Sequence, residues 1–165
     1  HHGRATNRCP RRRRHRVTQP RQRVGIAVVL TRDGTRCLVG IRSSETSLAN
    51  MLEFPGGKSV PGESTRDTAI RECLEETGIA VDAIQLLEHR SHDYDHGRVA
   101  LDFWLCHARG DHDQPSATQP FGWRPTRELN LRDFPKANAG LIRRLVAAES
   151  LEQLAAGGQT ESTHD

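Results

Sequence analysis

The sequence predicts a single mixed α/β domain of the α+β type, flanked by a basic leader and a short C-terminal tail. Three observations support this prediction: short apolar runs rich in β-branched residues, two segments with helical periodicity, and a length of 165 residues, which suits one domain. We expect the leader at 1–23, the domain at 24–150 and the tail at 151–165.

Strands and helices alternate along the expected domain. The apolar run 24–30 is followed by the turn pair Asp33-Gly34 and a returning strand, which is typical of a hairpin. A helix over 64–77 starts on Ser64, which can cap it, and ends before Gly78. The other expected elements are strands at 37–41, 51–54, 81–89, 99–107 and 122–124, and a second helix at 138–148.

Charge is divided unevenly along the chain. The formal net charge is +3, but nine of the 24 basic residues and none of the acidic residues lie in 1–23. The remaining residues therefore carry 15 Lys and Arg against 21 Asp and Glu, a net charge of −6. An acidic domain is a poor non-specific binder of phosphate polymers, so we do not expect nucleic acid as its partner. The leader has the composition of a solvated, disordered tail, although it could touch nucleic acid or act as an address.

Composition excludes several protein classes. No run of about 18 apolar residues is present, and the leader lacks the apolar centre of a secretory signal, so we expect neither a membrane span nor secretion. The four cysteines contain no Cys-x-x-Cys pair, which argues against a zinc ribbon or a disulfide scaffold. We therefore expect reduced thiols, a cytoplasmic location and a monomer.

One segment gathers carboxylates on a single helix face. At 100° per residue, Glu72, Glu75 and Glu76 lie within about 100° of one another, opposite the apolar side chains of the same helix. Like charges at this spacing repel, and the C-terminal end of a helix disfavours anions. A solvated charged face is one explanation of the cluster, and a site for a hard cation, Mg²⁺ or Mn²⁺ rather than zinc, is the other. Arg71 can orient Glu75, and Glu63 can reach back from the preceding loop.

The wider pattern resembles the Nudix box, Gly-x5-Glu-x7-Arg-Glu-U-x-Glu-Glu-x-Gly-U, where U is aliphatic. The matching residues are Gly57, Glu63, Arg71, Glu72, Glu75, Glu76, Gly78 and Ile79, and Cys73 stands at the first U position. The resemblance implies a Nudix-like mixed β-sheet sandwiched between helices and a Mg²⁺-dependent hydrolase of nucleoside diphosphates linked to another group. It implies that Glu72, Glu75, Glu76 and the carbonyl of Gly56 are metal ligands, that a glutamate is the catalytic base, and that Arg71 and Glu63 assist catalysis.

Segments outside the box are similar to MutT-type 8-oxo-dGTP diphosphatases. The similarity covers about 24–148 and is carried by LEFPGGK at 52–58 and DFPKAN at 133–138. It implies conversion of 8-oxo-dGTP to 8-oxo-dGMP and pyrophosphate, a reaction that prevents mutation. In that family the residue matching Asn138 reads the oxidised purine, which suits an amide because it offers a donor and an acceptor. Taken alone, Asn138 could equally be a helix N-cap.

Three further residues match positions that contact the nucleotide in that family. Arg42 suits a phosphate because a guanidinium is planar and always charged. Glu53 and Phe54 match pocket-lining positions, although either could be an ordinary strand or core residue. Arg98 is a weaker match for a phosphate contact, since its register is off by one.

One family position departs from the pattern. A distant glutamate that joins the metal site in these enzymes is replaced by Ala117, so either Asp111 or Asp113 takes its place or the site has fewer protein ligands. The His and Asp residues within 92–97 are typical of a hairpin turn rather than a metal cluster. The alternatives are a Nudix hydrolase of ADP-ribose or of a pyrimidine deoxynucleotide, and a non-catalytic Nudix nucleotide sensor whose leader binds DNA.

Overall fold

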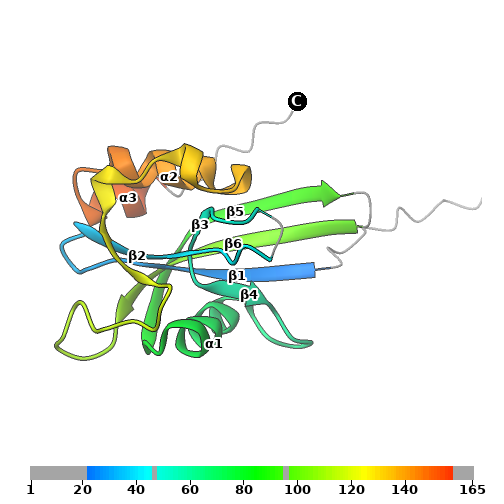
Figure 1. Ribbon diagram of the computed structural model, residues 1–165, viewed down its shortest axis with the longest axis horizontal. Helices are drawn as coiled ribbons and strands as arrows, with labels where there is room; N and C mark the ends of the chain where they lie inside the picture. The colour runs from blue at the N-terminus through cyan, green and yellow to red at the C-terminus, as the bar shows by residue number, and fades with distance from the viewer. Residues whose placement is uncertain (1–21, 46–47, 95–96, 158–165) are drawn as a thin grey trace, which may run out of the picture.

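The fold is built on a four-stranded mixed sheet and a smaller antiparallel sheet. A computed structural model describes residues 22–45, 48–94 and 97–157. The larger sheet has the order β4-β1-β6-β5, in which β1 runs parallel to β6 while the other neighbours are antiparallel, and the smaller sheet has the order β3-β2-β7 (Figure 1). The strands are β1 (Gln22–Val29), β2 (Arg36–Ile41), β3 (Leu52–Glu53), β4 (Gly56–Lys58), β5 (Val81–Tyr94), β6 (Gly97–Ala108) and β7 (Gly122–Pro125).

Helices cover both sides of this arrangement, as the resemblance implied. Helix α1 (Thr65–Thr77) lies on one side, and α2 (Ala139–Ala147) with α3 (Leu151–Ala156) lies on the other (Figure 1). Each side has its own apolar cluster, because alternate residues of β1 and β6 point to opposite faces. Three short 3-10 turns connect β7 to α2: Thr126–Glu128, Leu131–Asp133 and Lys136–Asn138.

The ends and packing of α1 follow from particular residues. Ser64 caps the helix by accepting a hydrogen bond from the Asp67 N–H at 3.1 Å, and Gly78 ends it in a left-handed conformation with φ of 75°. A Cβ on Gly25 of β1 would lie 2.1 Å from the Thr65 carbonyl oxygen, so only glycine lets the helix approach the strand this closely. The expected helix start and stop are confirmed.

Several expected boundaries were wrong. The expected strand at 51–54 was followed by no further strand, but Gly56–Lys58 forms β4 because it pairs with β1, with Gly57 opposite Gly25. The hairpin of β5 and β6 reaches Tyr94 and Gly97, well beyond the expected loop start. Residues 151–156 were expected as part of the tail, but they form α3, since Leu154 is buried in the α2-side cluster.

The expected leader is also shorter than 1–23. Gln22 and Arg23 belong to β1 and pair with β6, whereas residues 1–21 lie outside the described part of the chain. Within the described residues, no helix is long and apolar enough to cross a membrane.

Candidate active site

Arg71 is the centre of a carboxylate network on α1. Its Nε and Nη2 donate to the two oxygens of Glu63 at 2.9 and 3.0 Å. Its Nη1 donates to Glu72 at 2.9 Å and to Glu75 at 3.2 Å. Both contacts expected from the sequence, Arg71 with Glu75 and Glu63 with the helix, are therefore present.

Glu63 is held from several sides at once. Besides Arg71, the Thr68 hydroxyl donates to its Oε1 at 2.6 Å and the Val60 N–H donates at 3.3 Å. The hydrogen bonds from Arg71, followed by that from Thr68, lower the pKa of Glu63 to about 2. Glu63 thus stays ionised and fixes Arg71. The role of Thr68 was missed by sequence reasoning, because a threonine on a helix carries no signal of its own.

Glu72 and Glu76 lie against the glycines of β4. The Gly56 N–H donates to Glu76 Oε1 at 3.2 Å. A Cβ on Gly57 would lie 2.6 Å from Cδ of Glu72 and within 2.9 Å of both its oxygens. The carboxylate of Glu72 therefore occupies space that is open only because residue 57 is glycine.

The environment of Glu76 favours its neutral form. Burial raises the pKa of Glu76 to about 7, the Gly56 N–H opposes this shift, and Glu72 and then Glu53 add to it. Two neighbouring carboxylates, one of which is held partly out of water, are a suitable place for a cation.

The donor set fits a hard divalent cation. The candidate ligands are carboxylate oxygens of Glu72 and Glu76 and the backbone of the adjacent Gly56, with no sulfur or imidazole among them. Glu75 turns toward Arg71, and its side chain is 57% exposed. In the described ranges, no three His, Cys, Asp or Glu side chains lie close enough to hold a metal by themselves. The arrangement suits Mg²⁺, which keeps several waters and binds substrate phosphates.

Arg42 and Glu53 connect this site to the smaller sheet. Nη1 of Arg42, which follows β2, donates to Oε2 of Glu53 on β3 at 3.1 Å. Burial raises the pKa of Glu53, while the charge of Arg42 opposes the shift. The negative charge of Glu53 also contributes to the raised pKa of Glu76. These two predicted substrate residues therefore pair with each other beside the glutamates.

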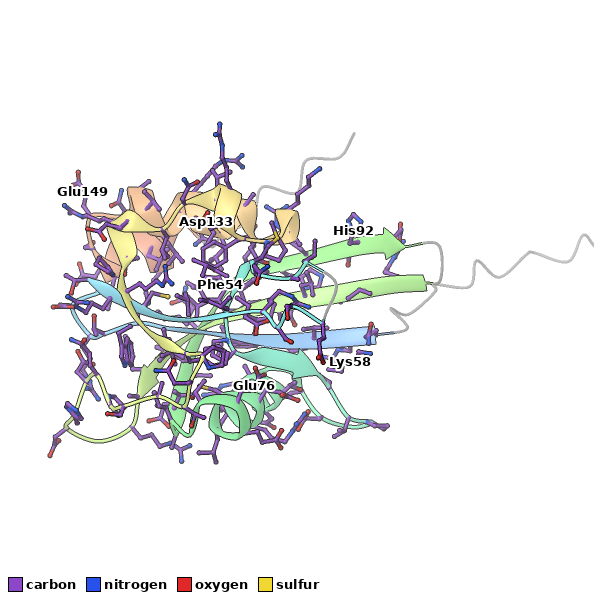
Figure 2. All side chains as sticks on the ribbon, in the orientation of Figure 1. Phe54, Lys58, Glu76, His92, Asp133 and Glu149 are labelled. Atoms are coloured by element: carbon purple, nitrogen blue, oxygen red, sulfur yellow. The ribbon has the colours of Figure 1, made fainter. Side chains whose placement is uncertain are left out.

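Phe54 belongs to the apolar cluster on the α2 side and lies between Glu76 and helices α2 and α3 in Figure 2. Its ring stacks on Phe134 with a centroid distance of 5.2 Å and an interplanar angle of 25°. Both residues are almost fully buried. Sequence reasoning placed Phe54 in the pocket but missed Phe134, although Phe134 belongs to the quoted DFPKAN segment.

Asn138 is buried at the start of α2. The residue is 9% exposed and occupies the N-cap position, but its side chain makes no capping hydrogen bond. Its backbone N–H donates to the Pro135 carbonyl at 2.9 Å. The N-cap explanation of this asparagine is therefore wrong, because its amide does not bond the helix.

Asp113 does not replace the missing glutamate. Its carboxylate accepts hydrogen bonds from the backbone N–H of Arg32 at 3.1 and 3.0 Å and pairs with the Arg32 guanidinium at 3.2 Å. Arg32 follows the end of β1, whereas Gly57 pairs with Gly25 near its start, a separation of about 15–20 Å along the strand. Ala117 packs against the apolar cluster beside α1.

The hairpin residues form an ion pair. Asp93 pairs with Arg98 at 2.7 Å, and this hydrogen bond lowers the pKa of Asp93. His92 lies on β5 (Figure 2). The other members of the polar stretch, residues 95 and 96, lie outside the described part of the chain. Arg98 is thus engaged in the hairpin rather than directed at the glutamates.

The chain is similar to known proteins along most of its length. The family profile described as NUDIX domain matches residues 26–144. The chain is 31% identical over 125 residues to the 8-oxo-dGTP diphosphatase of Escherichia coli K12, which covers 75% of this chain and 97% of that protein. It is 34% identical over 105 residues to the 8-oxo-dGTP diphosphatase of Haemophilus influenzae, covering 59% of this chain and 72% of that protein.

Solved structures give the same result. The crystal structure of a MutT NUDIX hydrolase from Burkholderia pseudomallei is 25% identical, covers 76% of this chain and 98% of that one, and has a TM-score of 0.59. The profile, the relative in Escherichia coli and the fold agree. The chain belongs to the Nudix family.

Proposed function

We propose that the chain is a Mg²⁺-dependent nucleoside triphosphate pyrophosphohydrolase that converts 8-oxo-dGTP into 8-oxo-dGMP and pyrophosphate. The observation that carries the substrate assignment is the side-chain amide of Asn138, a buried residue whose amide does not cap its helix. It lies at the end of the segment that supplies the stacked ring of Phe134. The names of the two bacterial relatives support the same assignment.

The amide suits the oxidised base. 8-Oxoguanine presents O6 as an acceptor beside N7–H as a donor, whereas guanine presents two acceptors at the same edge. An asparagine can satisfy the first pair completely, but the second leaves its carbonyl oxygen facing an acceptor. An unsatisfied buried polar group costs about 1–3 kcal/mol, which corresponds to a preference of roughly 5- to 150-fold for the oxidised nucleotide.

The reaction would take place beside α1. Glu72, Glu76 and the Gly56 carbonyl would hold Mg²⁺, and Glu75 would be a third glutamate within reach. When bound, the ion would neutralise phosphate charge and make a bound water more acidic. Water attacks phosphorus, most favourably the β-phosphorus, the bond to the α–β bridging oxygen breaks, and a box glutamate takes the proton of the water. Mn²⁺ fits the same donors.

The surrounding residues hold these groups in place. Arg71 keeps Glu72 and Glu75 at fixed positions, and Glu63 in turn immobilises Arg71. An ion pair with Glu53 holds Arg42 near the glutamates. Arg42 would contact the phosphates of the nucleotide. The acidic residues of the domain thus serve a cation, while a free nucleotide rather than nucleic acid is the substrate. We further infer that the enzyme acts as a monomer in the cytoplasm.

Asn138→Ala tests the substrate assignment. The ratio of kcat/KM for 8-oxo-dGTP to that for dGTP should fall by at least tenfold, while kcat for dGTP changes little. An unchanged ratio would show that Asn138 does not read the base, and the substrate would then be sought among ADP-ribose and pyrimidine nucleotides. Nucleotide binding without turnover in the wild-type chain would favour the sensor instead.

A further inference from the structure

Glu88 and Arg90 form an ion pair against the first turn of α2. Nε of Arg90 donates a hydrogen bond to Oε1 of Glu88 at 2.8 Å, and Nη2 forms an ion pair with the same oxygen at 2.7 Å. Because the two residues lie two positions apart in β5, their side chains point to the same face of the sheet. That face is the α2 side, since Glu88 and Arg90 pair with Phe103 and Leu101, which belong to or pack against the α2-side cluster.

Gly140 leaves the space that this pair occupies. A Cβ at position 140 would lie 2.1 Å from Nη2 of Arg90 and 3.0 Å from Oε1 of Glu88. The guanidinium therefore lies directly on the backbone of α2, two residues beyond Asn138. A larger side chain at 140 would displace it.

Attachment of α2 to the sheet does not require this pair. Leu141, Ile142 and Leu145 of the helix are already buried in the α2-side cluster, and Arg144 donates to the Leu87 carbonyl of β5. The pair also has a cost, because both Arg90 nitrogens lie against the same oxygen of Glu88. Its Oε2 is buried and has no hydrogen-bond partner among the described residues.

The start of α2 is where a fixed backbone position matters. Asn138 does not cap the helix with its own side chain, so the position of its amide depends on what packs against the helix start. A displacement of about 1 Å at a recognition group can cost on the order of 100-fold in rate. The Glu88–Arg90 pair lies against the backbone at Gly140, two residues beyond Asn138, and fills the space between β5 and the start of α2.

We propose that the Glu88–Arg90 pair positions Asn138 and thereby determines how strongly the site prefers 8-oxo-dGTP to dGTP. This inference rests on the proposed function. Arg90 and Glu88 are positioning residues in this account, because they act on the base through the backbone of α2.

Arg90→Leu is the first test, with Arg109→Leu as its control. Arg109 pairs with Asp82 of β5 at 2.8 Å in a comparable exposed ion pair at the start of the strand. Arg90→Leu should lower the preference for 8-oxo-dGTP by about tenfold, as expected for a displacement of Asn138 by less than about 1 Å, while kcat for dGTP stays within about twofold. Arg109→Leu should leave the preference unchanged.

Gly140→Ala displaces the same guanidinium without removing it. Alanine favours the helix over glycine, so the melting temperature should not fall, whereas the preference should fall as in Arg90→Leu. A merely structural role of the pair predicts the opposite combination, a lower melting temperature with an unchanged preference.

The side-chain amide resonance of Asn138 in the free protein provides a readout that needs no substrate. It should shift in Arg90→Leu and Gly140→Ala but not in Arg109→Leu. An unchanged resonance and preference in the first two variants would overturn the proposal. A wild-type chain that does not prefer 8-oxo-dGTP would overturn the proposed function and with it the role of the pair in selectivity. The amide resonance would then still decide whether the pair positions Asn138.

Discussion

Replacement of Gly57 by alanine should damage the candidate metal site without unfolding the chain. The added Cβ would lie 2.6 Å from Cδ of Glu72 and 2.7 Å from its Oε1, whereas ordinary contacts begin near 3.4 Å. The carboxylate must therefore move by about 0.8 Å. Since the end of a flexible side chain has to move, rather than the backbone, this movement costs little stability.

The same movement should cost much activity. Displacement of a catalytic group by about 1 Å is associated with losses on the order of 100-fold, so we expect kcat to fall between about 10- and 100-fold. The Mg²⁺ concentration required for half-maximal rate should rise as well, because Glu72 is one of the candidate ligands.

The assay is pyrophosphate release at a series of Mg²⁺ concentrations, together with thermal melting. Gly122→Ala is the matched control, since a Cβ at that position meets no atom within 4 Å. Wild-type turnover and Mg²⁺ dependence in Gly57→Ala would refute the placement of Glu72 at the metal. A large loss of melting temperature would show that the glycine serves folding instead.

Three further outcomes are expected. Glu76→Gln should lower turnover by at least about 100-fold. Its melting temperature in the absence of metal should be unchanged or higher, because the new amide can still accept from the Gly56 N–H and does not repel Glu72. Phe134→Ala should destabilise the fold by about 3–5 kcal/mol in chemical denaturation, because the ring is 2% exposed and stacked on Phe54. The pKa of Glu63 is lowered to about 2 in the folded chain, so its contribution to stability is complete above about pH 4.5 and is lost as the pH falls toward 2. Between about pH 4.5 and pH 2, the melting temperature should therefore fall less steeply with pH for Glu63→Gln than for the wild type.

Local signals predicted the site helix well. The cap at Ser64, the end at Gly78 and the contact between Arg71 and Glu63 depend on short spacings that a sequence displays directly. The gathering of Glu72, Glu75 and Glu76 on one face follows from helical geometry alone. Helical geometry does not predict that Glu75 turns to Arg71 while Glu76 turns to β4.

Features that depend on contacts distant in sequence were missed. Gly56–Lys58 has poor intrinsic strand propensity and becomes a strand only because β1 supplies a partner. Helix α3 is short, and although Ser150 caps it, a helix of this length is stabilised mainly by the burial of Leu154. Asp113 was a reasonable candidate ligand by position, but Arg32, which is 81 residues away in the sequence, binds it.

The substrate preference of the purified chain decides whether it is an 8-oxo-dGTP diphosphatase. With Mg²⁺ present, 8-oxo-dGTP, dGTP, dCTP and ADP-ribose are supplied in parallel, and the nucleoside monophosphate formed from each is measured by chromatography. We expect the highest kcat/KM for 8-oxo-dGTP, at least about tenfold above dGTP, with pyrophosphate as the second product. A preference for ADP-ribose or dCTP, or no product from any of the four, would contradict it.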